Sequence, residues 1–184
     1  MNLKDLKIDC INKRIPIIHD DSIIYIAKLI RDYKLSNMLE IGSGLGYSAY
    51  FIRSNTNIKD IVSIEKNIDN FNFIIDNLKN LSIDFINDDA FIYEPKNKFD
   101  LIFIDGPKNK QEILFEKYSH FLNNKGIIII DNILMNNLKL KTPSKRILGL
   151  INKNEHFKKF LLSQKEWNIS FLNIGDGLAI CTKK

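Results

Sequence analysis

Short apolar runs that alternate with amphipathic segments constrain the fold of this chain more than any other feature. Five runs rich in Ile and Val are continuous rather than alternating, which is typical of strands covered on both faces. These expected strands span residues 37–42, 60–65, 82–87, 99–105 and 126–132. Helical patterns lie among them, at 20–33, 68–81 and 109–122. Repeated strand and helix predict a doubly wound, mostly parallel α/β sheet with helices on both faces.

The last third of the chain departs from this alternation. A polar, basic connection over 133–146 leads into a helix expected over about 144–164. Two further strands are expected at 167–173 and 178–182, and the turn between them is short enough for an antiparallel hairpin. The sheet should therefore contain one reversed strand near the C-terminus.

Composition limits the class of protein. The 184 residues are 45% hydrophobic and 27% charged, which fits a single domain over 1–184. Cys10 and Cys181 follow no CxxC spacing, which excludes a zinc knuckle or a redox pair. With no long apolar run and no signal-peptide pattern, we expect a cytoplasmic chain with no membrane partner. The net charge of +5 fits either a polyanionic partner or a merely solvated lysine-rich surface.

A glycine-rich turn after the first strand is the strongest local motif. Residues 40–48 read EIGSGLGYS, with glycines at 42, 44 and 46. Such a turn lets the backbone approach a ligand closely, and the next helix offers free N–H groups to an anion, although a plain tight turn has the same pattern. The absence of GK[ST] excludes a P-loop, and GxGxG differs from the dinucleotide GxGxxG.

Carboxylates follow the second and third strands at positions suited to a nucleoside. Glu65 ends the second strand, where it can accept hydrogen bonds from both hydroxyls of a ribose. Asp89 and Ala90 follow the third strand, where an acid beside a small residue could receive an adenine amino group. Each acid alone could simply be solvated, but their order along the strands favours a cofactor pocket.

Oxygen donors also follow the fourth and fifth strands. Asp105 ends the fourth, and Asp131 and Asn132 end the fifth. Because the carboxyl ends of parallel strands line the ligand crevice, these side chains should converge. Two carboxylates and an amide form a site that suits Mg²⁺ far better than zinc, unless each acid merely caps a turn. Lys108, three residues after Asp105, is close enough to act on a substrate held there.

These motifs together resemble the S-adenosylmethionine-dependent, metal-dependent O-methyltransferases of the catechol and caffeoyl-CoA type. The resemblance runs from RIPII (14–18) through LEIGSGLGYS, IVSIE, NDDA, FIDGPK and IIIIDN to FLNIGDGLAI. It implies a Rossmann-like class I methyltransferase fold, S-adenosylmethionine as cofactor and Mg²⁺ or another divalent ion. It also implies a general-base role for Lys108, with Asp105 as a further catalytic residue, and metal ligation by Asp105, Asp131 and Asn132. The residues implied in cofactor binding are Ile18, Glu40, Gly42, Gly44, Gly46, Ser48, Glu65, Asp89, Ala90 and Asp105.

Within that family the sequence is most similar to the bacterial tRNA 5-hydroxyuridine methyltransferases, through IDGPK, DNIL, the basic segment and FLNIGDGLAI. This implies methylation of 5-hydroxyuridine at the wobble position of the tRNA anticodon to 5-methoxyuridine. The basic segment would then bind tRNA phosphates, and its cations are Lys139, Lys141, Lys145 and Arg146. A small catechol-like or phenolic acceptor is the alternative, and a nucleotide-binding module without catalysis is a second. A homodimer is also expected, although the segment before Arg14, part of the N-terminal stretch 1–18, is short for the family, and Gly106-Pro107 departs from its usual pattern.

Overall fold

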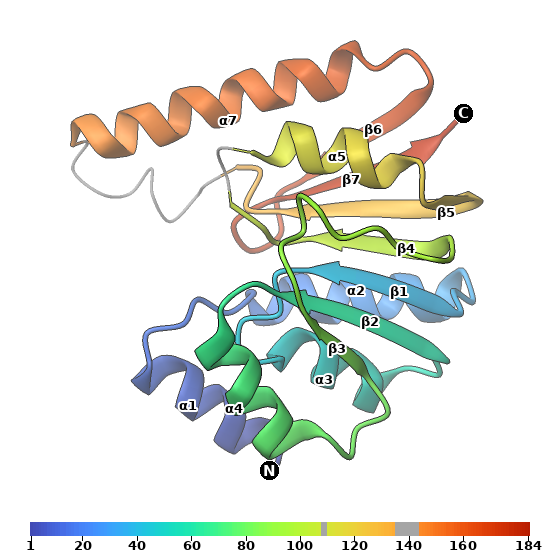
Figure 1. Ribbon diagram of the computed structural model, residues 1–184. Coiled ribbons are helices and arrows are strands. Elements are labelled where there is room, and N and C mark those ends of the chain that lie inside the picture. The colour runs from blue at the N-terminus through green and yellow to red at the C-terminus, as the bar shows by residue number, and fades with distance from the viewer. Residues whose placement is uncertain (108–109, 135–143) are drawn as a thin grey trace.

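A seven-stranded sheet forms the centre of the computed structural model, which describes residues 1–107, 110–134 and 144–184 (Figure 1). The strand order is β3-β2-β1-β4-β5-β7-β6, and only β7 runs opposite to the others. This confirms the predicted mostly parallel sheet with one reversed strand. The strands are β1 (Asn37–Ile41), β2 (Asp60–Glu65), β3 (Asp84–Asn87), β4 (Phe99–Ile104), β5 (Leu122–Asp131), β6 (Trp167–Leu172) and β7 (Leu178–Lys183).

Helices cover both faces of the sheet, as expected for strands that are apolar throughout. Four of them share one core cluster, which includes Leu6, Ile26, Ile52 and Ile74. They are α1 (Leu3–Asn12), α2 (Asp20–Asp32), α3 (Tyr47–Asn55) and α4 (Ile68–Leu78). The opposite face packs against α5 (Gln111–Ser119) and α7 (Lys145–Ser163). Successive strand residues such as Met38 and Leu39 belong to opposite clusters, which explains the continuous apolar runs.

Several element boundaries differ from the prediction, and one helix was not predicted. The helix expected over 109–122 ends at Ser119, and Leu122 instead begins β5, where it pairs with Phe99. A turn in which the Phe121 N–H donates to the Tyr118 carbonyl separates the two elements. The helix expected over 68–81 ends at Leu78. Helix α1 was not predicted at all, although Leu6 and Cys10 lie four residues apart on its buried side.

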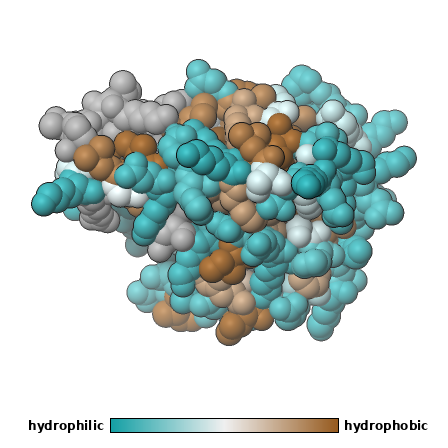
Figure 2. All heavy atoms as spheres, turned by 90° about the horizontal axis from the view of Figure 1, so that it is seen from above, coloured by the Kyte–Doolittle hydropathy of each residue, from teal (hydrophilic) through white to brown (hydrophobic). Residues whose placement is uncertain are grey.

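The carboxyl ends of the parallel strands meet at one edge of the sheet, on the left in Figure 1. The β6–β7 turn returns to this edge, because Ile133 and Leu134 donate their backbone N–H groups to the carbonyls of Gly177 and Asp176 at 2.9 and 3.0 Å. The face that carries α7 is mostly hydrophilic, with apolar side chains in several smaller groups (Figure 2). Within the described ranges, no helix combines the length and apolar character needed to cross a bilayer.

Candidate active site

The glycine turn brings the end of β1 against the end of β4. Gly42 has a φ of +98°, and a β-carbon placed on it would overlap the backbone carbonyl oxygen of Asp105. Only glycine permits both the conformation and the close approach. Gly46 serves another purpose, since a β-carbon there would crowd Leu78 and Phe85 and it borders neither cavity described below. The predicted glycine turn therefore lines a cavity at Gly42 and makes a packing contact at Gly46.

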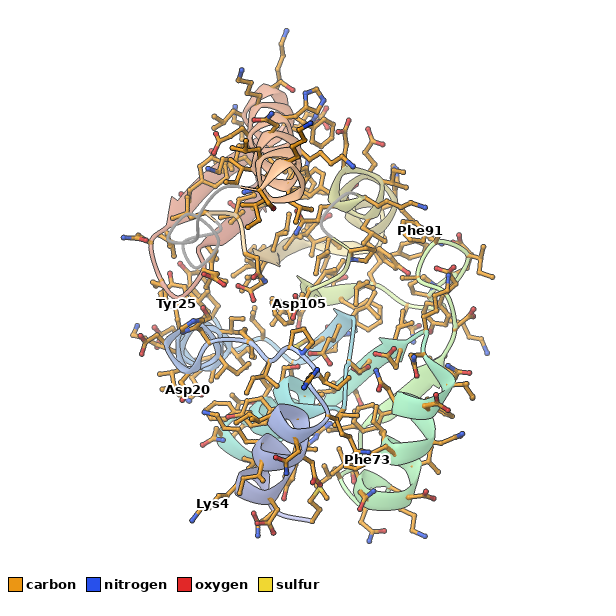
Figure 3. All side chains as sticks on the ribbon, turned by 90° about the vertical axis from the view of Figure 1, so that its left-hand side faces the viewer. Lys4, Asp20, Tyr25, Phe73, Phe91 and Asp105 are labelled. Atoms are coloured by element: carbon orange, nitrogen blue, oxygen red, sulfur yellow. The ribbon has the colours of Figure 1, made fainter. Side chains whose placement is uncertain are left out.

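A cavity of about 380 Å³ opens at the carboxyl edge between β1, β2 and β4. It brings together residues that are distant in the sequence, among them predicted cofactor-binding residues from the ends of β1, β2, β3 and β4. Figure 3 looks onto this edge, with Asp105 near the centre and Phe91 to one side. The lining residues are Ile41, Gly42, Ile64, Glu65, Lys66, Asp88, Asp89, Ala90, Phe91, Asp105, Gly106, Pro107 and Lys110.

Backbone donors fix the carboxylate of Glu65 at the wall of this cavity. One carboxylate oxygen accepts from the N–H of Gly44 at 2.8 Å, and the other accepts from the N–H of Asn67 at 2.7 Å. The residue is only 9% exposed. Each oxygen keeps further acceptor capacity, so the group is oriented in advance for a ligand with two neighbouring hydroxyls.

Asp89 and Ala90 form the far end of the cavity. Asp89 accepts from the Phe91 N–H at 3.0 Å and pairs with Lys66 at 2.7 Å, and the side-chain bond from Lys66 lowers the pKa of Asp89. The Ala90 carbonyl accepts from the Tyr118 hydroxyl at 2.8 Å. Sequence reasoning missed Lys110, whose ammonium lies 4.7 Å from the centre of the Phe91 ring. Only the fold brings this cation and ring together at the cavity wall.

A smaller, more enclosed pocket adjoins the first, since Gly42 and Asp105 line both. Ile18, Gly44 and Ser48 line it as well, so three more predicted cofactor-binding residues lie there. The segment from Pro16 to Ile18 closes this pocket over the glycine turn. Together the two spaces form one elongated site with Asp105 at the junction.

Glu40 lies beneath the site and lines neither cavity. It is fully buried, and the hydroxyls of Ser48 and Ser63 donate to its two carboxylate oxygens. Its position follows from strand alternation, because Glu40 shares a face with Met38 and pairs in register with Ser63. Glu40 was predicted to bind a cofactor, but it does not line either cavity. Glu40 instead orients Ser48, which does line the second pocket.

Burial raises the pKa of Glu40 to about 7, against the lowering effect of the bonds from Ser48 and Ser63. The pKa of an unfolded glutamate is near 4.5, so this carboxyl binds its proton more tightly in the folded state. Its contribution to the free energy of unfolding therefore falls as the pH rises from about 4.5 to about 7. This carboxyl should thus cost the fold about 3 kcal/mol above pH 7. We expect Glu40→Gln to gain stability relative to the wild type as pH rises through this window, measured by urea unfolding at pH 5 and 8. Glu116→Gln, on the exposed side of α5, is the control. If the free energy of unfolding of Glu40→Gln differed from that of the wild type by the same amount at both pH values, the raised pKa of Glu40 would be contradicted.

The predicted oxygen donors lie at the ends of the neighbouring strands β4 and β5. Ile104 pairs with Ile130, so Asp105 and Asp131 follow in register on neighbouring strands. Asp131 is 4% exposed, and the amide of Asn132 donates to one of its carboxylate oxygens at 2.9 Å. In the described ranges no three His, Cys, Asp or Glu side chains cluster as a metal centre, and this set is instead two carboxylates with an amide. Such hard oxygen donors fit a divalent cation like Mg²⁺.

The structure describes only some of the predicted basic residues. Lys108, Lys139 and Lys141 lie outside the described residues. Lys145 is the exposed first residue of α7 and Arg146 follows it. The helix begins at the same side of the molecule as the carboxyl edge of the sheet (Figure 1).

Comparison with known proteins identifies a family for this chain. The profile of the O-methyltransferase family matches residues 3–184. A proposed caffeoyl-CoA O-methyltransferase from Staphylococcus aureus has a structure that superposes with a TM-score of 0.90 at 27% identity, covering 100% of this chain and 93% of that one. The Bacillus cereus O-methyltransferase in complex with SAH gives a TM-score of 0.81 at 18% identity, covering 99% and 90%. Tapetum-specific methyltransferase 1 of Arabidopsis thaliana is 24% identical over 178 residues, 89% of this chain and 76% of that protein.

These similarities confirm the predicted Rossmann-like methyltransferase fold. The family profile extends over all the elements that build the two cavities, from α1 to β7. This chain therefore belongs to the O-methyltransferase family.

Proposed function

We propose that the protein transfers a methyl group from S-adenosylmethionine to a hydroxyl oxygen. The observation that carries this proposal is the elongated site, in which Glu65, Asp89 and Ala90 border one cavity, Ser48 borders the other, and Asp105 borders both. The larger cavity, of about 380 Å³, has room for a nucleoside, and the small enclosed pocket beside Ser48 would widen to take the amino-acid end of the cofactor. Structures of similar fold from Bacillus cereus and Podospora anserina were solved with SAH bound.

The donor set at the ends of β4 and β5 would hold a divalent cation. Asp105 and Asp131 follow paired residues on adjacent strands, and carboxylate oxygens are ligands that Mg²⁺ prefers. When bound, the cation supplies positive charge that lowers the pKa of an acceptor hydroxyl. Asp105 also borders both cofactor cavities, so an acceptor held there would lie beside the methyl donor.

The residues of the chain would perform the remaining steps. The two cavities align donor and acceptor, and Lys108 takes the hydroxyl proton. The acceptor oxygen then forms a bond to the methyl carbon while the carbon–sulfur bond breaks, and the sulfur keeps the electron pair. The products are the methyl ether and S-adenosylhomocysteine.

For the acceptor we propose 5-hydroxyuridine of the tRNA anticodon, because its adjacent oxygens at C5 and C4 form a chelate like that of a catechol. Lys145 at the start of α7 adds an exposed cation on the same side as the site. A small phenolic acceptor is the second candidate, favoured by the caffeoyl-CoA name of the Staphylococcus aureus protein. We also propose that the protein forms a homodimer, which a measurement of its molecular mass in solution would test.

One experiment separates these candidates. The purified protein is incubated with labelled S-adenosylmethionine and either bulk tRNA from a strain that lacks the enzyme or a panel of catechols, with and without EDTA. We expect label in tRNA, in a nucleoside with the mass of 5-methoxyuridine, and its loss in EDTA. If only a catechol became labelled, the acceptor would be a small phenolic compound and not tRNA. No transfer to either, despite calorimetric binding of the cofactor, would indicate a non-catalytic module.

Charge-removing substitutions test the predicted RNA interaction. Replacing Lys141, Lys145 and Arg146 with Gln should weaken tRNA binding and make it less dependent on salt, with a slope that falls by about 0.7 to 0.9 for each phosphate no longer neutralised. Filter binding across a range of KCl concentrations gives this slope. Lys34 and Lys59 are matched controls, because they are exposed beside a separate pocket that lies before β1 and β2, at the opposite edge of the sheet. An unchanged slope in the triple variant would contradict the interaction.

A further inference from the structure

The backbone directly after β5 adopts an unusual conformation at the candidate metal site. Asn132 has a φ of +64°, in the left-handed region that few residues other than glycine adopt. The kink falls between Asp131 and Ile133, so it determines where the Asp131 and Asn132 side chains point. Asparagine tolerates this region better than most residues, but the conformation still costs energy that surrounding contacts can offset.

Two buried amide side chains bond to the backbone carbonyls directly before and directly after Asn132. Gln111, the first residue of α5, donates to the Asp131 carbonyl at 3.3 Å. Asn154, in the middle of α7, donates to the Ile133 carbonyl at 2.5 Å. Each side chain is 2% exposed. Neither bond could be read from the sequence, because the two amides lie 20 positions before and 21 positions after the carbonyls that they contact.

Packing alone does not explain these two amides. Within the described residues, the side-chain oxygens of Gln111 and Asn154 are both buried without a hydrogen-bond partner. A buried polar atom without a partner costs stability, and an apolar side chain of similar size would avoid that cost. The surroundings are apolar, since Leu114, Phe115 and Phe157 on the same two helices belong to one core cluster. What the amides provide, and an apolar residue would not, is a donor to the backbone on each side of Asn132.

We infer that Gln111 and Asn154 are positioning residues that fix the Asp131–Ile133 backbone, and so set the affinity of the Asp105, Asp131 and Asn132 site for a divalent cation. This rests on the proposed function. Gln111 also begins the helix that follows Asp105, so it ties the exits of β4 and β5 to each other. Asn154 links the same kink to α7. Neither residue lines the cofactor cavities, so the inference separates metal affinity from cofactor affinity.

The test measures binding rather than turnover. Gln111→Met and Asn154→Leu each remove one donor while keeping an apolar side chain of similar size. Calorimetry with Mn²⁺ alone should show its dissociation constant raised about tenfold in each variant, the range found when groups that orient metal ligands are removed. The dissociation constant for SAH and the thermal midpoint should stay close to the wild-type values. Asn77→Leu is the matched control, because the Asn77 amide donates to the Phe73 carbonyl at 2.9 Å in α4, far along the chain from the kink.

The outcomes are distinct. Wild-type Mn²⁺ affinity in both variants would overturn the positioning role and leave the metal site itself intact. Equal losses of Mn²⁺ and SAH affinity would also overturn it, because they would indicate general disruption of the site. If the wild type itself bound no Mn²⁺, both the proposed metal site and this inference would fall. The two substitutions lie on different helices, so one remains informative if the other prevents folding.

Discussion

Gly42→Ala should lower the free energy of unfolding by about 3–5 kcal/mol and abolish binding of S-adenosylmethionine. Two effects add at this position. A residue with a β-carbon is strained at a φ of +98°, and that carbon would overlap the Asp105 carbonyl oxygen. The obstacle is backbone at the end of β4, so it cannot rotate away as a side chain would. Relief requires β1 and β4 to separate at the carboxyl edge, where both cavities meet.

Urea unfolding and calorimetry with the cofactor measure these two effects. Gly149→Ala is the matched control, because Gly149 lies within α7 and a β-carbon there meets nothing within 4 Å. The same substitution should stabilise that helix by about 0.5–1 kcal/mol. A loss of less than about 1 kcal/mol for Gly42→Ala, with cofactor binding retained, would show that the close approach of Gly42 to Asp105 is not needed.

Local pattern predicted the parts of the site that lie at strand ends. Glu65, Ala90 and Asp105 line the cavity because each lies at or just after the end of a parallel strand, and the topology of such sheets places these ends at one edge. Glu40 shows the limit of that reasoning. It precedes the glycine turn but lies within the strand, so alternation directs its side chain toward Ser48 and Ser63 rather than into either cavity. Side chains two residues apart in a strand point to the same face, so the buried Met38 indicates that Glu40 is also directed into the core.

Contacts between distant elements could not be predicted in this way. Gln111 and Asn154 look like ordinary polar residues in helical patterns, and only the packing of α5 and α7 against β5 buries their amides. The end of α5 is a smaller example. Phe121 and Leu122 continue an apolar helical pattern, and pairing of Leu122 with Phe99 converts the second of them to strand. Tertiary pairing here outweighs the local preference.

Asp131→Ala should reduce methyl transfer by at least about a hundredfold while cofactor binding stays close to the wild-type value. Asp131 lines neither cofactor cavity, so its removal leaves the contacts of Glu65, Asp89 and Ser48 in place. It does remove one of the two carboxylates that the register of β4 and β5 brings together. The acceptor hydroxyl would then be without the positive charge that favours its ionised form at neutral pH.

Single-turnover transfer from labelled S-adenosylmethionine, measured beside calorimetric binding of SAH, separates chemistry from cofactor affinity. Asp131→Asn keeps the shape of the side chain and tests the charge alone, should the alanine variant fold poorly. Asp60→Ala is the control, because Asp60 is an exposed carboxylate at the opposite end of a parallel strand. Full transfer by Asp131→Ala, or by the wild type in excess EDTA, would show that the reaction needs no cation at the ends of β4 and β5. A loss of transfer with SAH affinity unchanged would place the role of Asp131 at the acceptor, because the cofactor cavities would then be intact.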